Sequence, residues 1–280
     1  MLNFKPVFIE ANDLDDAWHQ LLWNLHEYGR RYPVTSGSHA GQDRIAFDYV
    51  AGIIKDPHKR PLTPRMPHGL GIPGPIDRGD EQIDDYFAKY LMFSDFEDEE
   101  EEKNNEYKYA TWIAGDGDHD KTDLCSYSQV NWIIDHFKKH GYGNDHCYIT
   151  IGNPDTNQNY DRPFMVCNEC EHVNVKDIRL DVCEECGSKN IEIDDTIRGT
   201  SPCLRGLDFR IVDGYLTTHV VYRSWDLWGG FPENMGGFTL LNEHIAGELG
   251  VSPGPLTFSC KSLHAYSHHV DIIAKRLRKD

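Results

Sequence analysis

The sequence predicts an α+β protein, because helical and strand patterns both recur along the chain. Residues 14–28 place seven apolar or aromatic side chains on one helical face, and 128–140 repeat that spacing. β-Type runs flank Asp213-Gly214, a dipeptide that favours a two-residue hairpin turn, and 147–152 read as a strand. With 280 residues, the chain is expected to form one large domain, 1–280, with room for a small insertion.

The remaining elements are predicted from shorter patterns. Residues 44–54 read as one strand, and a short helix is expected over 83–93. Between them, 56–80 contain six of the fourteen prolines, which predicts an extended connection without regular structure. A helix is expected to begin after Asn234, and a last strand within 262–269.

The charge of the chain excludes one class of function. A net charge of −18 argues against general nucleic-acid binding, because such proteins neutralise phosphates with basic surfaces. Part of the charge is the run DFEDEEEEKNNE at 95–106, which we interpret as a solvated loop. No apolar stretch is long enough to cross a bilayer, and the first residues do not resemble a secretory signal. We therefore expect a cytoplasmic protein that does not contact a membrane.

Four of the eight cysteines form two close pairs in a polar segment, residues 160–199. The pairs are Cys167 with Cys170 and, twelve residues further on, Cys183 with Cys186. Two such pairs supply four thiolates that can surround zinc, and the metal supplies folding energy that a small segment lacks. Four protein ligands leave no open position, so we predict structural Zn²⁺ in an inserted zinc-ribbon subdomain, 160–199. A redox site is less consistent with the sequence, which lacks a thioredoxin-like βαβ context.

Cys203 lies beside the predicted hairpin. Folding the chain about Asp213-Gly214 places Cys203 opposite Ser224 and beside Arg223. A guanidinium next to a cysteine favours the thiolate, which is the nucleophilic form. A lone cysteine is more often a small buried apolar residue, so the arginine is what favours catalysis here.

The residues downstream supply further polar groups. Asn234 could cap a helix, or its amide could read a uracil edge by donating to O4 and accepting from N3–H. Strand alternation places His264 and Tyr266 on one side, although such a pair is usually structural.

These residues occur in short motifs with a fixed order and spacing. The motifs are Pro202-Cys203, then YRSWD, GFPEN and LHAY. They resemble the signature of the thymidylate synthase family, with 20 residues from Cys203 to Arg223, 11 to Asn234, 30 to His264 and 2 to Tyr266. The strong match covers 201–269, and a weaker one runs upstream through EYKYATW, SQVNWIIDHFKKH and CYITIGNPD.

The resemblance implies a homodimer of α+β subunits, each built on a large mixed sheet with flanking helices. It implies that Cys203 attacks C6 of dUMP, which makes C5 nucleophilic toward the methylene of 5,10-methylenetetrahydrofolate or a related methylene-pterin. Each site residue receives a role by the same resemblance. Arg223 and Ser224 hold the phosphate, Asp226 and Asn234 orient the pyrimidine, His264 and Tyr266 hold the sugar 3′-hydroxyl, and Tyr109 assists removal of the C5 proton.

The sequence departs from the family pattern in three places. Asp145-His146 stand where familiar members carry two arginines that reach the phosphate bound by the other subunit, so we expect His146 and other groups to take that role. Lys89 or Tyr90 occupies the place of a glutamate that organises water. Only 267–280 follow Tyr266, whereas bacterial and eukaryotic members have a longer closing segment there.

These departures leave three functions open. A dry site lets hydride complete a methyl group, whereas a site that admits water yields a hydroxymethyl group. The first prediction is thymidylate synthase activity on dUMP, and the alternative is a dUMP or dCMP hydroxymethylase. Asn234 favours uracil, because cytosine-specific relatives tend to carry aspartate there. A catalytically silent nucleotide-binding or regulatory protein is the third possibility, but such a protein has no need of Cys203.

Overall fold

The structure is a computed structural model of the chain. It describes residues 4–34, 41–67, 69, 71–93, 108–115, 127–152, 163–174, 182–198 and 202–279. The chain divides into two compact units, of which unit 1 takes 1–95, 108–150 and 203–280, and unit 2 takes 96–107 and 151–202. The acidic run predicted to be a loop, 95–106, lies outside the described residues.

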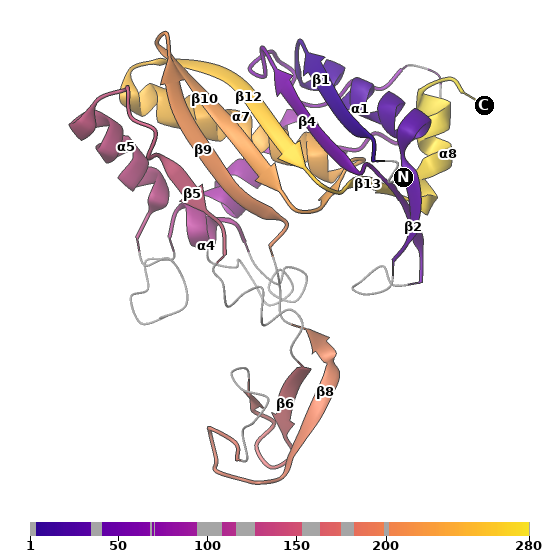
Figure 1. Cartoon of the computed structure of the whole chain (residues 1–280), viewed down its shortest axis with the longest axis vertical. Helices are drawn as coiled ribbons and strands as arrows, with labels where there is room; N and C mark the ends of the chain where they lie inside the picture. Colours follow the sequence, from indigo (N-terminus) through magenta and orange to yellow (C-terminus); the bar gives the residue numbers. More distant parts are fainter. Residues whose placement is uncertain are drawn as a thin grey trace. The chain divides into compact units, whose positions relative to one another are not determined.

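A six-stranded mixed sheet forms the centre of unit 1 (Figure 1), which confirms the predicted fold class. Neighbouring strands are parallel between β1 and β4 and between β10 and β12, and antiparallel at the other three junctions. In spatial order the strands are β1 (Pro6–Ala11), β4 (Tyr49–Ile54), β12 (Ser252–Cys260), β10 (Tyr215–Tyr222), β9 (Leu204–Val212) and β5 (Tyr148–Thr150).

One face of this sheet is the core face. Its strand register aligns Val7, Val50, Cys260 and Tyr222 in one row, and all four side chains are buried. Helices α1 (Leu14–Tyr28) and α7 (Gly230–Leu249) pack against the sheet. The bounds of α1 match the prediction, because Asp13 accepts a hydrogen bond from the Asp16 N–H at 2.9 Å and caps the helix.

A smaller four-stranded sheet shows where the prediction of one strand over 44–54 is wrong. Its order is β11 (Trp225–Asp226), β13 (Leu263–Tyr266), β3 (Asp43–Ala46) and β2 (Arg30–Pro33). The chain therefore leaves this sheet after β3 and enters the central sheet at β4. The Asp48 carboxylate holds the crossing, since it accepts from the Lys5 N–H at 2.9 Å and pairs with Arg30 at 2.8 Å.

Helix α7 begins earlier than predicted. Asp226 Oδ2 accepts from the N–H groups of Gly229 at 2.8 Å and Gly230 at 3.0 Å, which satisfies the first donors of the helix. Asn234 therefore lies inside the first turns of α7 and not before it. The cause is the capping carboxylate, which follows directly from the end of β11.

Two glycines of α7 allow another helical segment to approach closely. Helix α2 (Asp80–Asp85) continues into a π-helical turn, η1 (Tyr86–Leu91), where the sequence predicts a helix over 83–93. A Cβ at Gly236 would lie 2.7 Å from Ile83, and one at Gly237 would lie 2.5 Å from Tyr86. Only glycine permits this approach, which brings η1 toward the residues of the candidate site.

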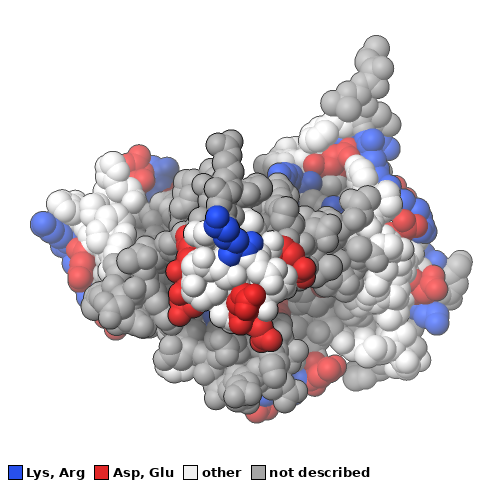
Figure 2. Space-filling model, turned by 90° about the horizontal axis from the view of Figure 1, so that it is seen from below, with Lys and Arg blue, Asp and Glu red and all other residues white. Residues whose placement is uncertain are grey.

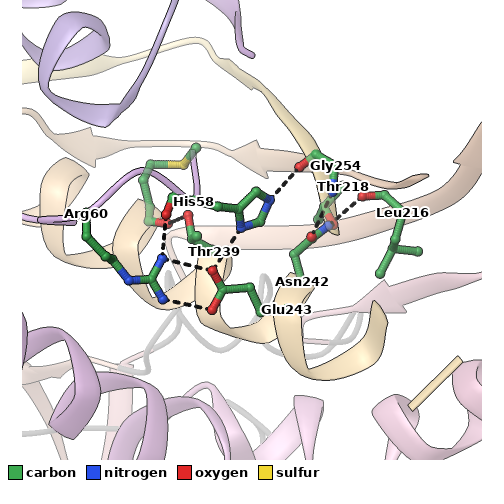
Figure 3. Close-up of polar contacts among 9 residues, drawn as sticks. His58, Arg60, Leu216, Thr218, Thr239, Asn242, Glu243 and Gly254 are labelled. Carbon is green, nitrogen blue, oxygen red and sulfur yellow. Dashed lines mark hydrogen bonds and ion pairs between the residues drawn. The ribbon is translucent and has the colours of Figure 1, made fainter. Parts of the chain in front are cut away.

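The segment between β4 and α2 has no helix or strand among its described residues, as predicted. It is fastened to α7 by the polar contacts drawn in Figure 3. Arg60 pairs with both carboxylate oxygens of Glu243, at 2.8 and 2.9 Å. His58 bridges Glu243 and the carbonyl oxygen of Gly254, at 3.0 and 2.9 Å.

Asn242 stabilises an irregularity between β10 and β12 through polar contacts that are also drawn in Figure 3. The register of the two strands shifts between Leu216 and Thr218. The Asn242 Nδ2 group donates to the Leu216 carbonyl oxygen at 2.8 Å and to Thr218 Oγ1 at 2.9 Å, and its Oδ1 accepts from the Gly254 N–H at 3.3 Å. This fully buried amide satisfies the backbone groups that the shift leaves unpaired.

The other helices in the described part of unit 1 are α4 (Ala110–Ile113), α5 (Gln129–His140) and α8 (Ser267–Arg276). The predicted helix over 128–140 is confirmed, with Ser128 as its cap. No helix in the described part of the chain combines the length and apolar character needed to cross a membrane. Unit 2 contains a three-stranded antiparallel sheet in the order β7 (Val173–Asn174), β6 (Pro163–Cys167), β8 (Ile191–Arg198).

Candidate active site

The β9–β10 hairpin determines where Cys203 lies. Asp213 and Gly214 both have positive φ, 51° and 81°, which confirms the two-residue turn. The pairing follows the predicted register from the turn to Gly206 and Val221, and then shifts by one residue.

The shift changes the neighbour of Cys203. Tyr222 pairs with Leu204, and the Arg223 N–H donates to the Cys203 carbonyl oxygen at 2.9 Å. Cys203 therefore lies opposite Arg223, and the prediction that it lies opposite Ser224 is wrong. A β-bulge inserts one extra residue in β9, which a fixed register about the turn cannot include.

Tyr109 is brought to Cys203 from a distant part of the sequence. The buried Tyr109 hydroxyl accepts a hydrogen bond from the Leu204 N–H at 3.2 Å. Leu204 follows Cys203 directly in the chain, so this bond fixes a phenol next to the cysteine.

A tyrosine occupies the place where the resemblance implies a glutamate. The Tyr90 ring stands edge-on to Tyr109 with centroids 5.4 Å apart, and it stacks on Tyr86 at 5.2 Å. Lys89 lies toward Asp85, with Nζ 3.9 Å from its carboxylate oxygen. Of the two residues that the sequence offers for this place, Tyr90 is the one beside Tyr109.

Asn234 is held by two aromatic side chains. Its Oδ1 accepts from the Tyr222 hydroxyl at 3.1 Å and from Trp225 Nε1 at 2.8 Å. The Tyr222 and Trp225 rings are stacked, with centroids 3.9 Å apart and an interplanar angle of 6°. Burial, together with neighbouring Tyr109 and Tyr86, raises the pKa of Tyr222 well above its ordinary value, so its hydroxyl stays a donor.

Tyr222 also connects Asn234 to the surroundings of Cys203. The Tyr222 side chain is hydrogen-bonded to Tyr109. A hydrogen-bonded path thus runs from the Leu204 N–H through Tyr109 and Tyr222 to Asn234.

Asp226 has a structural task. Besides its two bonds to the start of α7, its Oδ1 lies 3.4 Å from the Trp228 N–H. Its strand, β11, pairs with β13 so that Asp226 lies beside His264. Asp226 therefore positions the helix that carries Asn234 and the strand that carries His264.

His264 and Tyr266 project from β13 with their rings 5.0 Å apart at 85°. The buried His264 places Nδ1 3.0 Å from the Ser262 carbonyl oxygen. Burial, and then the nearby groups of Asp226 and Cys203, raise the pKa of Tyr266, while Arg44 opposes them. Tyr266 thus lies within electrostatic range of Cys203, although 63 positions of the numbering separate them.

The other described cysteines of unit 1 differ from Cys203 in burial. Burial raises the pKa of Cys147 to about 11 and that of Cys260 to about 12, so both stay protonated at neutral pH. Cys203 is partly exposed, and both it and Arg223 act on Cys260 electrostatically. Ser224 follows Arg223 and is half-buried.

Asp145 and His146 lie exposed in the loop between α5 and β5. His146 Nε2 lies 4.0 Å from Asp145 Oδ1, and its ring centroid is 6.1 Å from that of His136. The ring centroids of His136 and His140 are 4.5 Å apart. Cationic or hydrogen-bonding groups are therefore present near the place where the resemblance expects two arginines.

The four cysteines of unit 2 form the predicted cluster. Their sulfurs all lie within 4.8 Å of one another, and the pairs Cys167–Cys186 and Cys170–Cys183 are 3.6 Å apart. Four thiolates around zinc at about 2.3 Å would have sulfurs about 3.8 Å apart. The cluster therefore has the size that a tetrahedral zinc site requires.

The backbone around the cluster repeats itself. The Cys167 N–H donates to the His172 carbonyl oxygen at 3.0 Å, and the Cys183 N–H donates to that of Ser188 at 2.7 Å. Glu171 and Gly187, each following the second cysteine of a pair, have positive φ of 58° and 71°.

Backbone N–H groups also point at the buried sulfurs. Burial opposes the thiolate of Cys167, but hydrogen bonds from the N–H groups of Glu169 and Cys170 outweigh it and lower its pKa. The corresponding donors, Glu185 and Cys186, lower the pKa of Cys183 to about 6. These two matching turns supply the thiolates that a zinc ion binds.

Sequence reasoning missed two residues of the site, Tyr222 and Trp225. Both flank Arg223 and Ser224, and both could have been noticed as aromatic side chains with a donor atom. Their connection to Asn234 required the start of α7, which the sequence did not place correctly.

Comparison with known proteins locates the similarity. Residues 190–280 match the family model described as thymidylate synthase. A protein of Methanosarcina acetivorans named "Putative thymidylate synthase" is 38% identical over 79 residues, which cover 28% of this chain and 36% of that protein. A protein of the same name from Methanosarcina barkeri is 24% identical over 265 residues, 95% of this chain and 92% of its own length.

A third relative of that name, from Methanothermobacter thermautotrophicus, is 38% identical over 73 residues, 26% of this chain and 33% of its own length. The matches of higher identity thus span about a third of the relatives' length. The family model includes Cys203 and Asn234, but its matched residues do not reach Tyr109 or the four cysteines of unit 2.

Proposed function

We propose that this chain belongs to the thymidylate synthase family and transfers a one-carbon unit from a methylene-pterin to C5 of dUMP. The observation that carries the proposal is the hydrogen-bonded path that joins the backbone next to Cys203 to Tyr109, Tyr222 and Asn234. It places a nucleophile, a phenol and an amide around one site, although they come from three separate segments of the chain.

The first step forms a bond between Cys203 Sγ and C6 of the pyrimidine. The electrons of the C5–C6 double bond move toward O4, which gives an enolate with C5 as its nucleophilic carbon. Asn234 stabilises the charge that develops on O4 by donating from Nδ2. Arg223, adjacent to Cys203, supplies the positive charge for the 5′-phosphate, and Ser224 supplies a further donor.

The second step needs a proton acceptor at C5. When bound, 5,10-methylenetetrahydrofolate or a related pterin supplies the electrophilic carbon and, for a methyl product, the hydride. Tyr109 is fixed beside Cys203 and is the group that assists removal of the C5 proton. Loss of that proton would allow the bond between the transferred carbon and the pterin nitrogen to break, and addition of hydride or water to that carbon would then restore the C5–C6 double bond and expel the Cys203 thiolate. His264 and Tyr266 hold the sugar 3′-hydroxyl during these steps.

The proposed assembly is a homodimer, and the central sheet supports it. The face opposite the core carries side chains that stay at least partly exposed in the chain alone. They form two rows across the strands: Phe8, Ala51, Ser259, Val221 and Thr150, and Glu10, Ile53, Thr257, His219, Asp208 and Tyr148. Phe8 is 72% exposed and Tyr148 40%. A sheet face with exposed aromatic residues favours association with a second copy.

The surface charge gives no support to nucleic-acid binding. On the face shown in Figure 2, the acidic and basic side chains of the described residues are interspersed, and the central basic group is flanked by acidic ones. A nucleic-acid surface would gather its cations. Four cysteine ligands leave no open position, so we assign zinc in unit 2 a structural role. We also propose that the chain is a cytoplasmic enzyme of nucleotide biosynthesis.

The test is mass spectrometry of the nucleotide after incubation with dUMP and methylenetetrahydrofolate, with dCMP in parallel. Formation of dTMP together with dihydrofolate supports the proposal. A hydroxymethyl product would make the chain a hydroxymethylase and identify its base. No product with either nucleotide, in protein that binds dUMP, would favour a silent binding protein.

A further inference from the structure

We infer that Trp225 and Tyr222 fix the Asn234 amide so that only its Nδ2 group, a donor, faces the pyrimidine, and that Trp225 is thereby a positioning residue for base selection. The inference rests on the proposed function, because it concerns the base of the same nucleotide. It concerns residues that position Asn234 and need not touch the substrate.

The Asn234 oxygen has no acceptor capacity left. An amide oxygen has two lone pairs, and here they receive the Tyr222 hydroxyl at 3.1 Å and Trp225 Nε1 at 2.8 Å. Among the described residues none is seen to accept from Nδ2, and the side chain is half-buried. The donor end of the amide is thus the end available to a ligand.

Trp225 prevents the amide from turning over. Indole Nε1–H can only donate, so a reversed amide would place two donors against each other. The indole itself is 2% exposed and stacks on Tyr222, and the Phe231 ring lies 4.8 Å away. A side chain confined in this way cannot rotate to relieve the donor–donor contact.

Tyr222 reinforces the same orientation. It is hydrogen-bonded to Tyr109, whose oxygen accepts from the Leu204 N–H. The Asn234 oxygen can only accept, so the one proton of the Tyr222 hydroxyl is directed at it over 3.1 Å. The path therefore ends with a donor directed at Asn234 Oδ1.

The consequence is a preference for a carbonyl at position 4 of the base. Nδ2 can donate to O4 of uracil, whereas the 4-amino group of cytosine would meet it donor to donor. This differs from the expectation that Asn234 also accepts from N3–H, since its oxygen is already occupied. A site that leaves a buried polar group unpaired discriminates strongly against the wrong ligand.

The experiment measures binding of dUMP and dCMP by titration calorimetry to the full chain and to three variants. Trp225→Phe keeps an aromatic ring but removes the donor, so the dUMP-to-dCMP affinity ratio should fall by about tenfold. Tyr222→Phe removes the second donor, and the ratio should fall by about threefold. Trp228→Phe is the matched control, because Trp228 contacts Trp18 and His269 and should leave the ratio unchanged.

The outcomes separate the inference from the proposed function. A wild-type preference for dUMP that Trp225→Phe leaves unchanged overturns the inference and leaves the function standing. Wild-type protein that binds neither nucleotide overturns both. If Trp225→Phe does not fold, Tyr222→Phe decides: a reduced ratio supports the inference, and an unchanged ratio contradicts it. A general loss of affinity for both nucleotides at an unchanged ratio indicates a merely structural role for Trp225 and also overturns it.

Discussion

Asn234 and Asn242 lie about two turns apart on α7, yet the structure uses their amides differently. Asn242 is fully buried, and both ends of its amide are bonded to strands β10 and β12 or their flanking backbone. Asn234 is half-buried, and only its oxygen is engaged. A satisfied amide stabilises the fold, whereas an amide with one end available can bind a ligand.

The cysteines divide in the same way. The four of unit 2 face one another at zinc-binding distances, and Cys147 and Cys260 are buried with raised pKa values. Cys203 is partly exposed beside Arg223 and the Tyr109 path. Residue type alone does not distinguish these groups, but the partners of each side chain do.

The largest effect is expected where a cysteine is structural. Cys183→Ser removes one of four ligands, and structural zinc sites contribute on the order of 10 kcal/mol to folding. We expect the variant to lose its zinc, about one ion per chain, and the structure of the sheet β7-β6-β8 with it. Elemental analysis and amide hydrogen exchange measure both. Glu185→Gln, an exposed change in the same turn, is the control and should keep the metal.

Asn242→Asp should be the most destabilising single change in α7. The carboxylate would face the Leu216 carbonyl oxygen and Thr218 Oγ1, which both accept from the amide in the native protein. A buried, unpaired charge costs about 3–5 kcal/mol. Urea unfolding should show this loss, and the variant protein that remains folded should keep its base preference. A stability equal to that of the wild type would remove the distinction between the two asparagines.

The same substitution at Asn234 should change selectivity and not stability. A carboxylate at 234 still accepts from Tyr222 and Trp225, but it has no donor for O4. We expect Asn234→Asp to unfold within about 1 kcal/mol of the wild type and to shift the ratio of kcat/KM from dUMP toward dCMP by about 100-fold. Kinetics with both nucleotides test this, and an unchanged ratio would contradict the functional assignment of Asn234.

The smallest effect concerns Glu243, the neighbour of Asn242. Burial raises the pKa of Glu243, but hydrogen bonds from Arg60 and His58 outweigh it and lower the pKa below its ordinary 4.5. Its contribution is therefore present above the unfolded pKa and lost as pH falls through the folded value. Glu243→Gln should cost about 1 kcal/mol near neutral pH, and the difference should shrink in urea unfolding as the pH falls below 4.5. A constant difference across this range would contradict the ion-pair account.

The sequence predicted local structure well where the cause is local. The turn at Asp213-Gly214, the helix over 14–28 and the two cysteine pairs each depend on residues close together in the chain. The order and spacing of the motifs also pointed to the family whose model matches residues 190–280. The zinc-ribbon bounds, 160–199, stay a prediction.

Most of the errors arose where distant residues decide. The bulge in β9 and the break between β3 and β4 depend on tertiary contacts of Tyr222 and Asp48. The early start of α7 has a local cause, the Asp226 cap, which the sequence did not reveal as a cap. The orientation of Asn234 depends on all of α7, β10 and β11. The sequence could therefore identify the site residues, but it could not predict which end of the Asn234 amide faces a ligand.

The most direct test of the central claim is to locate the covalent bond to the nucleotide. Protein incubated with dUMP and methylenetetrahydrofolate is quenched with acid, digested and mapped by mass spectrometry. The account predicts a nucleotide adduct on the peptide that contains Cys203, and neither adduct nor turnover for Cys203→Ser. An adduct on another cysteine, or full turnover by Cys203→Ser, would contradict it.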